Sequence, residues 1–246
     1  MSQVALVTGA ASGLGALICR ALWRSGYAVA FGDLSLQAAQ QAAQAIDPQG
    51  ERTLGLKLDV RRPEDFTAAI GQITARFGGL QVLVNNAALT LATPVMEIEA
   101  DEFDRVITTN LRGTFLGCQR VGRYFAQQRY GRIINLASLA GQNGGTASGA
   151  HYAASKGGII TLTKVFARAL SGDGVTVNAI APGPQDLPSV RALVPPENLP
   201  ALLAAIPVHQ LGDPEFVAQM VLLLASPAAA SVSGATWDVN GGLFMR

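Results

Sequence analysis

A tyrosine, a lysine and a serine are the side chains of this sequence best suited to chemistry. Tyr152 and Lys156 stand four residues apart at the start of a predicted helix, so they share one of its faces. A fixed ammonium near a phenol lowers the pKa of the phenol, which then serves as general acid or base towards an alcohol or ketone oxygen. Ser138 follows a predicted strand, and its hydroxyl can donate to the same oxygen. Taken alone, a Tyr–Lys pair at this spacing is also typical of an exposed surface.

A glycine-rich turn near the N-terminus predicts a dinucleotide site. Gly9, Gly13 and Gly15 lie between an apolar run and a predicted helix, so backbone can approach a pyrophosphate at the helix N-terminus. Asp33 ends the second apolar run, where a carboxylate binds an adenosine ribose diol and repels a 2′-phosphate. Positions 10–18 and 32–36 hold no Arg or Lys, so we expect NAD rather than NADP. The alternatives are a purely structural turn and a helix N-cap at Asp33.

The elements that must position these residues alternate from end to end. Strands are predicted at 4–7, 28–31, 53–58, 82–84, 133–136, 175–180 and 235–239, and helices at 13–25, 35–46, 63–77, 101–128, 152–171 and 213–225. Most strands are apolar on both faces, as in a covered parallel sheet. We therefore expect an α/β fold, with residues 1–246 forming a single Rossmann-like domain around a doubly wound, parallel, seven-stranded sheet with helices on both faces. The proline-rich segment 183–212 is expected to be an irregular substrate loop or lid.

Composition narrows the set of partners. Of the 246 residues, 49% are hydrophobic and only 14% charged, and 18 basic against 17 acidic residues are spread along the chain. Without a basic stripe, we expect neither nucleic acid nor membrane as a partner. The N-terminus shows no signal peptide, and Ser226-Pro227 interrupts the uncharged stretch 216–237, so a cytoplasmic location is expected. Cys19 and Cys118 are expected to be buried, and no metal site is expected.

Several motifs in order make the chain resemble the short-chain dehydrogenase/reductase family over essentially its whole length. They are Thr8-Gly9-x-x-x-Gly13-x-Gly15, Asp59-Val60, Asn85-Asn86-Ala87-Ala88, Asn110, Ser138, Tyr152-x-x-x-Lys156 and Pro182-Gly183. The resemblance implies an enzyme acting on CH–OH groups. It implies Tyr152 as acid/base, Lys156 as the residue that lowers its pKa and holds the nicotinamide ribose, and Ser138 as donor to the substrate oxygen. Asn110 resembles the asparagine that supports a water-linked proton relay.

The resemblance also implies a cofactor site around these motifs. Asp59 and Val60 are similar to the family's adenine contact. The full set that we predict to bind NAD is Gly9, Ser12, Gly13, Leu14, Gly15, Asp33, Leu34, Asp59, Val60, Asn86, Ala87, Ala88, Tyr152, Lys156, Pro182, Gly183 and Gln185.

Three positions depart from the family pattern. Ser138 and Tyr152 are separated by one residue more than in many members, which places an insertion in the loop 142–148 beside the substrate. A threonine that contacts the nicotinamide amide is replaced by Leu187, so either Ser189 substitutes or the contact is lost. Gln210 stands where a basic residue is common.

The predicted function is hydride transfer between NAD(H) and an uncharged secondary alcohol or ketone, because segment 183–212 is largely apolar, with Arg191 as its one Lys or Arg. The closest alternative is a 3-oxoacyl-(acyl-carrier-protein) reductase. Arg129 and Arg132 would suit an acidic carrier, whereas Asp173 and Asp33 argue against this alternative. A dinucleotide sensor without turnover is a third hypothesis, which the complete catalytic set disfavours. His151 either touches substrate or packs at the helix start.

Apolar side chains on more than one helix face suggest subunit contacts. They lie in 101–128 and 152–171 and comprise Phe115, Leu116, Val121, Phe125, Ile159, Leu162 and Phe166. In the family such helices pair between subunits, and the segment Ser233–Arg246 often makes a second contact. We therefore expect a homotetramer.

Overall fold

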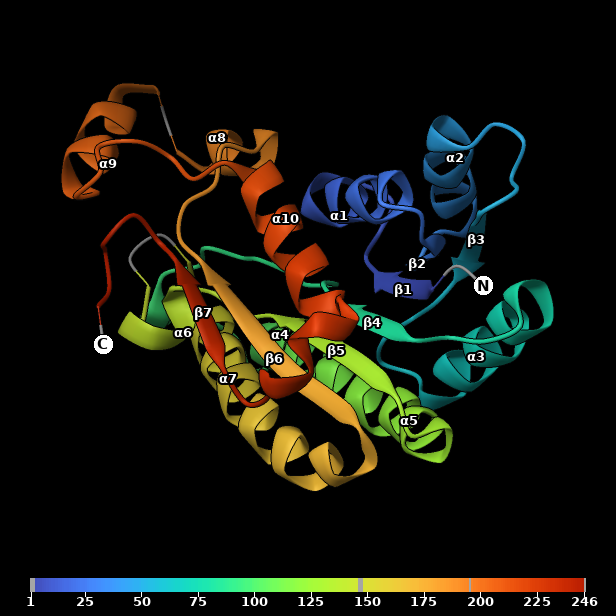
Figure 1. Cartoon of the computed structure of the whole chain (residues 1–246). Coiled ribbons are helices and arrows are strands. Elements are labelled where there is room, and N and C mark those ends of the chain that lie inside the picture. The colour runs from blue at the N-terminus through green and yellow to red at the C-terminus, as the bar shows by residue number, and fades with distance from the viewer. Residues whose placement is uncertain (1–2, 146–147, 195, 246) are drawn as a thin grey trace.

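A single parallel sheet organises the structure (Figure 1), a computed structural model that describes residues 3–145, 148–194 and 196–245. Its strands are β1 (Val4–Thr8), β2 (Ala28–Asp33), β3 (Thr53–Lys57), β4 (Val82–Asn85), β5 (Gly131–Leu136), β6 (Val175–Pro182) and β7 (Thr236–Val239). They pair in the order β3-β2-β1-β4-β5-β6-β7, every pair parallel. The direction of winding reverses between β1 and β4, where doubly wound sheets bind ligands. The predicted fold class is confirmed.

Successive side chains along each strand point to opposite faces of the sheet and pack into two separate hydrophobic cores. Ala5 and Val7 of β1 pack with α1 (Gly13–Arg24), α2 (Leu36–Ile46) and α10 (Pro214–Ala225). Val4 and Leu6 face the opposite side, which α3 (Pro63–Phe77), α5 (Gly113–Gln128) and α7 (Ala150–Leu170) cover. Both faces of the central strands are thus removed from water, which explains their continuous apolar sequence. Figure 1 shows the helices in layers on both sides of the sheet.

The helix predicted at 101–128 is not one regular α-helix. It consists of α4 (Ala100–Ile107), a π-helical turn over Thr108–Arg112, and α5. Asn110 stands in the middle of that turn and is fully buried. The prediction of one continuous helix was wrong because apolar spacing does not reveal a wider turn.

Segment 183–212 is more regular than predicted. The segment contains two helices, α8 (Pro188–Leu193) and α9 (Leu199–Ala205). A further short helix, α6 (Ala140–Asn143), lies earlier in the chain. Both helices carry a proline in their first turn, where the missing N–H costs no helical hydrogen bond. Pro188 and Pro200, two of the prolines that indicated an irregular loop, therefore mark helix starts. In Figure 1 these two helices lie at one end of the molecule, beyond the sheet.

Several side chains predicted to contact another subunit belong to the chain's own core. Leu116, Val121, Phe125 and Ile159 are at most 8% exposed. These residues point inward because α5 and α7 pack directly on the sheet. Phe115 and Phe166 remain partly buried and pack against each other, with ring centroids 5.7 Å apart.

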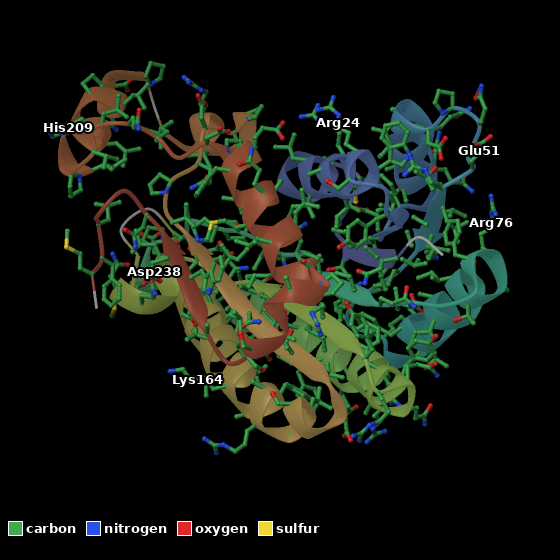
Figure 2. The ribbon with its side chains drawn as sticks, viewed as in Figure 1. Arg24, Glu51, Arg76, Lys164, His209 and Asp238 are labelled. Atoms are coloured by element: carbon green, nitrogen blue, oxygen red, sulfur yellow. The ribbon has the colours of Figure 1, made fainter. Side chains whose placement is uncertain are left out.

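The surface shows dispersed charge. Arg24, Arg76 and Lys164 project from separate edges of the fold (Figure 2). Among the described helices, none is long and apolar enough to cross a membrane. Cys19 and Cys118 are buried and free, as predicted.

Candidate functional site

The turns after β1 and β4 are joined by side chains at the point where the winding reverses. The Thr8 hydroxyl accepts hydrogen bonds from the backbone N–H groups of Asn86 and Ala87, each at 3.0 Å. The Asn86 amide donates to the carbonyls of Thr8 and Gly9, at 3.0 and 3.1 Å. The two turns therefore form one rigid cradle, next to which Ala88 is exposed.

Glycine is required in this cradle for two reasons. Gly13 has φ +54°, with open space around the position of a Cβ, and a Cβ on Gly15 would lie only 2.2 Å from the Gly9 carbonyl oxygen. Ser12 is the N-cap of α1 and is exposed, but its side chain makes no capping bond, and Leu14 is half-buried. The first N–H groups of α1 are thus available to a phosphate, and the residues present fit a dinucleotide.

The Asp33 carboxylate is held beside this cradle. One oxygen accepts from the backbone N–H of Ala11 at 3.1 Å and the other from that of Ser35 at 3.2 Å. The N-cap of α2 is Ser35, so the alternative that Asp33 is itself the N-cap was wrong. Leu34 is 60% exposed. A fixed carboxylate here can accept hydroxyl donors and repels a phosphate.

Asp59, predicted as an adenine contact, has both of its carboxylate oxygens hydrogen-bonded to Arg61. Arg61 donates to them through Nε at 2.8 Å and Nη2 at 2.6 Å. These bonds hold the pKa of the Asp59 carboxyl below its usual range. Val60 packs against Gly113 of α5. The ion pair of Asp59 with Arg61 could have been predicted from the sequence, because Arg61 is only two residues from Asp59.

The structure brings Ser138, Tyr152 and Lys156 together where β5 ends and α7 begins. The Lys156 ammonium donates to the Leu136 carbonyl at 2.6 Å and lies 5.5 Å from the centroid of the Tyr152 ring. The Ser138 and Thr90 side chains line the same pocket as the Tyr152 phenol and favour its ionised form. Thr90, which sequence reasoning missed, therefore joins the predicted group.

Burial dominates the electrostatics of this cluster. It raises the pKa of the Tyr152 phenol, and the hydroxyls of Ser138 and Thr90 offset only part of that effect. Burial also lowers the pKa of Lys156 to about 8. The expectation that Lys156 brings the pKa of Tyr152 below its ordinary value is therefore not what the structure shows, because the desolvation of the phenol outweighs the other effects.

Asn110 connects three elements around this cluster. Its side chain accepts from the Leu89 N–H at 2.7 Å and donates to the Leu89 carbonyl at 3.0 Å and to the Ser155 hydroxyl at 3.1 Å. The π-helical turn gives the amide this reach, since π turns widen a helix locally and are frequent at functional sites. Asn110 is thus fully buried in the π-helical turn and bonds to Ser155, the residue before Lys156.

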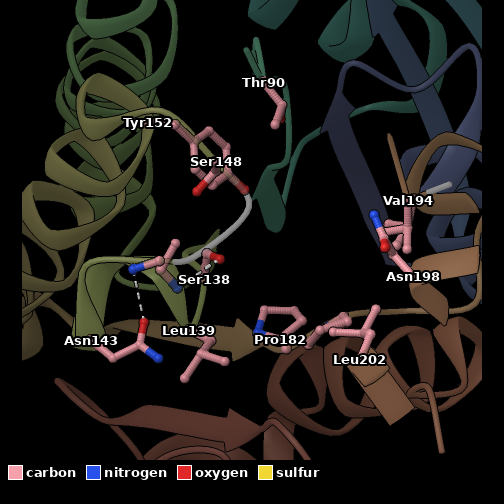
Figure 3. Close-up of a pocket in the computed structure, with 15 residues that line it drawn as sticks. Thr90, Ser138, Leu139, Asn143, Ser148, Tyr152, Pro182, Val194, Asn198 and Leu202 are labelled. Carbon is pink, nitrogen blue, oxygen red and sulfur yellow. Dashed lines mark hydrogen bonds between the residues drawn. The ribbon is translucent and has the colours of Figure 1, made fainter. Parts of the chain in front are cut away.

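A pocket of about 390 Å³ opens in front of Ser138 and Tyr152. Its opposite wall is formed by Val194, Asn198 and Leu202 from the α8–α9 region (Figure 3). Pro182 and Gly183 also line it, and none of the described residues that line it is charged. Its size is typical of a small-molecule site.

Near this pocket lie Gln185, which we predict to bind NAD, and Leu187, which replaces the family's threonine. Gln185 is only 4% exposed, and its amide donates to the Gly183 carbonyl at 3.1 Å, so it braces the loop. Leu187 is the N-cap of α8. The Ser189 side chain lies outside the described part of the chain, as do residues 146–147 of the insertion loop.

His151 lies next to Tyr152 but is fully buried. Its ring contacts Glu102 of α4 at 2.9 Å and the backbone N–H of Tyr152 at 2.9 Å. The suggestion that it touches substrate is therefore not supported, and Glu102 is a further residue that sequence reasoning missed.

The two arginines considered for carrier binding are both engaged within the chain. Arg132 is 3% exposed and donates to the carbonyls of Ser226, Gly131, Gly174 and Pro227. Its suggested role on the surface was wrong, because this guanidinium is fully committed to backbone. Arg129 forms an ion pair with Asp173.

Two features together define the class of protein as a dinucleotide-binding oxidoreductase. They are the cradle formed by the turns after β1 and β4, and the group of Ser138, Tyr152 and Lys156 beside an uncharged pocket. The family model described as "Enoyl-(Acyl carrier protein) reductase" matches residues 9–244. The chain is 41% identical over 244 residues to a 3-oxoacyl-(acyl-carrier-protein) reductase of Vibrio cholerae, covering 99% of this chain and 98% of the relative. Proteins of the same name from Pseudomonas aeruginosa and Staphylococcus epidermidis are 38% and 37% identical, covering 99% and 100% of this chain and 98% and 100% of the relatives. The chain belongs to the short-chain dehydrogenase/reductase family and is an oxidoreductase acting on a CH–OH group.

Proposed function

We propose that this chain interconverts 3-oxoacyl and 3-hydroxyacyl thioesters, with NAD(H) as its redox partner. The observation that carries the proposal is the Ser138–Tyr152 hydroxyl pair, which faces an uncharged pocket walled by Val194 and Leu202. Such a pocket suits an acyl chain, and the relatives' names supply the thioester. This substrate replaces the simple alcohol or ketone as the leading hypothesis.

In the proposed reduction, Ser138 donates a hydrogen bond to the 3-oxo oxygen and Tyr152 transfers its proton to that oxygen. A bound nicotinamide supplies the hydride to the carbonyl carbon. Lys156, held by the Leu136 carbonyl, stabilises the phenolate that remains. Asn110 fixes the loop after β4 and the Ser155 hydroxyl beside this lysine, and thereby supports the return of a proton.

NAD rather than NADP is the proposed cofactor because of Asp33. Its carboxylate is fixed by the N–H groups of Ala11 and Ser35, so it cannot easily turn away from a 2′-phosphate. The predicted cofactor-binding residues of the cradle, from Gly9 to Gly15 and from Asn86 to Ala88, would hold the diphosphate and ribose. Asp59 and Val60 would border the adenine.

The second candidate function is hydride transfer to or from an uncharged secondary alcohol or ketone that is not attached to a carrier protein. Two observations favour it. Asp173 already pairs with Arg129, and Arg132 is buried, so neither guanidinium is offered freely to an acidic carrier.

A substrate panel with both cofactors tests these proposals. We expect turnover of acetoacetyl-CoA or its carrier-protein analogue with NADH, faster than with NADPH, and a loss of about 10³-fold in kcat for Tyr152→Phe. Turnover confined to simple secondary alcohols would favour the second candidate. Undiminished turnover by Tyr152→Phe would contradict the assigned proton donor.

We also propose that residues 1–246 act as one domain in a cytoplasmic homotetramer, with segment 183–212 as the substrate lid. Exposed apolar side chains support the assembly, namely Val165 on α7 and Phe216 and Leu223 on α10, each more than half exposed. A monomeric mass in light scattering would contradict it.

A further inference from the structure

The first turn of α7, which carries Tyr152, lacks an ordinary cap. Its N-cap is Gly149, which has no side chain to accept a hydrogen bond from the helix. The first N–H groups of any α-helix have no partner within the helix, so a first turn inside a protein needs an acceptor from elsewhere. Tyr152 is the third residue of α7, and its N–H is one of these groups.

His151 supplies the missing acceptor. Its Nδ1 accepts the Tyr152 N–H at 2.9 Å, although the two residues are neighbours in sequence. The ring occupies the space that an N-cap side chain would need, because a Cβ on Gly149 would lie 2.3 Å from His151 Cε1. Gly149 and His151 thus form a unit in which the imidazole replaces the usual cap.

The far side of the same ring is fixed by Glu102. Because Nδ1 accepts a hydrogen bond, the proton of the neutral imidazole is on Nε2, which donates to Glu102 Oε1 at 2.9 Å. The hydrogen bonds from Thr93 and His151 hold the pKa of the Glu102 carboxyl below its usual range, so the acceptor stays ionised. The imidazole is fully buried between α4 and α7.

We propose that His151 and Glu102 are positioning residues for Tyr152: the carboxylate orients the imidazole, and the imidazole holds the backbone from which the phenol projects. This inference rests on the proposed role of Tyr152 as proton donor. It explains why a buried, hydrogen-bonded histidine stands beside that tyrosine without reaching the pocket.

Substitutions at His151 can separate the two bonds. In His151→Asn, Oδ1 takes the place of Nδ1 and keeps the bond to the Tyr152 N–H, but the bond to Glu102 is lost. In His151→Gln, the side-chain amide takes the place of Nε2 and keeps only the bond to Glu102. His151→Leu loses both bonds, and Glu102→Ala removes the same bond as His151→Asn.

The experiment measures kcat and the KM for NADH of the full chain with acetoacetyl-CoA, together with hydrogen exchange of the Tyr152 amide and thermal midpoints. We expect His151→Gln and His151→Leu to lower kcat about tenfold and to speed exchange of the Tyr152 amide about tenfold, with the KM for NADH unchanged within about twofold. His151→Asn and Glu102→Ala should each lower kcat by about threefold, and the double variant no further. Asp101→Asn, an exposed acid on the same helix, is the control.

Equal losses for His151→Asn and His151→Leu, or wild-type kcat and exchange in His151→Leu, would overturn the proposal. If the wild-type chain does not reduce acetoacetyl-CoA, the proposed function fails. Exchange of the Tyr152 amide needs no turnover, so it still decides whether His151 holds that backbone.

Discussion

The glycine-rich turn at residues 8–15 and the substrate segment at 183–212 are held in contrasting ways. Four hydrogen bonds through the Thr8 and Asn86 side chains fix the turn to the adjacent strand end. The substrate segment is joined across its two ends, where Gly212 donates to the Pro184 carbonyl at 2.9 Å and accepts from the Asp186 N–H at 2.8 Å. Between those ends, α8 and α9 present side chains to the pocket. Under the proposed function, cofactor binding thus depends on closely packed backbone at Gly15, whereas substrate choice depends on side chains that can be replaced without moving the backbone.

The largest expected effect comes from adding one carbon to the rigid region. Gly15→Ala places a Cβ 2.2 Å from the Gly9 carbonyl oxygen, so the backbone must shift. We expect the Kd for NADH to rise about a hundredfold, since overpacking of this kind costs about 1–3 kcal/mol. Fluorescence titration measures the affinity. Gly71→Ala in α3, where a Cβ has open space, is the matched control, and equal behaviour of the two variants would break the comparison.

A larger change in the substrate segment should have a smaller and more selective effect. Leu202→Trp fills part of the pocket opposite Ser138 and Tyr152. We expect kcat/KM for acyl thioesters to fall about tenfold, with a larger fall for longer acyl chains and an unchanged Kd for NADH. Steady-state kinetics over a series of chain lengths provide the measurement. A parallel loss of NADH affinity would show that the two regions are not independent; Ala204→Leu, on an exposed site of α9, is the control.

Beside the glycine-rich turn, a change of charge at Asp33 should alter the choice of cofactor and leave the geometry intact. Asp33→Asn removes a negative charge from the site proposed for the 2′-hydroxyl and keeps an acceptor for the Ala11 N–H. We expect the ratio of NADPH to NADH affinity to rise about tenfold, consistent with about 1–2 kcal/mol of relieved repulsion in a partly hydrated site. Titration of both cofactors tests this, and an unchanged ratio would remove Asp33 as the discriminating residue.

The smallest expected effect concerns Lys156, which lies between the two regions. Its pKa is about 8 in the folded protein and about 10.4 in an unfolded chain, so unfolding takes up a proton between these values. The free energy of unfolding should therefore rise with pH from about 8 to 10.4, relative to Lys156→Met, by on the order of 1 kcal/mol per pH unit. Urea unfolding at pH 8.5 and 9.5 measures the difference. A constant difference between the two proteins would contradict the lowered pKa.

The strands of the sheet could be predicted from the sequence because the pattern that marks a strand lies within a few consecutive residues. Residues Ala5 to Val7 are apolar at every position, as expected of a strand that is covered on both faces. The spacing of the glycines that follow marks the first turn. The same holds for Tyr152 and Lys156, whose relation follows from one turn of helix.

What could not be predicted depends on contacts between distant segments. The Asn110 side chain, within the π-helical turn, accepts from the N–H of Leu89, 21 residues earlier, and donates to its carbonyl. Arg132 looked like a surface cation, but carbonyls near residues 174 and 226 surround it. Glu102 and His151 are 49 residues apart, and nothing in their spacing indicates a pair. Each case is decided by the packing of whole elements.

The π-helical turn also constrains how the length of this chain can change. A π turn holds one more residue than an α turn over about the same rotation. Deleting one residue between Thr108 and Arg112 would therefore return the segment to regular α-helix and leave α4 and α5, and with them Glu102 and His151, in nearly their present orientation. Asn110 would lose the wide turn from which it reaches Leu89. In the history of the sequence, the loss of one residue here would remove the Asn110 bonds without disturbing the packing of the flanking helices.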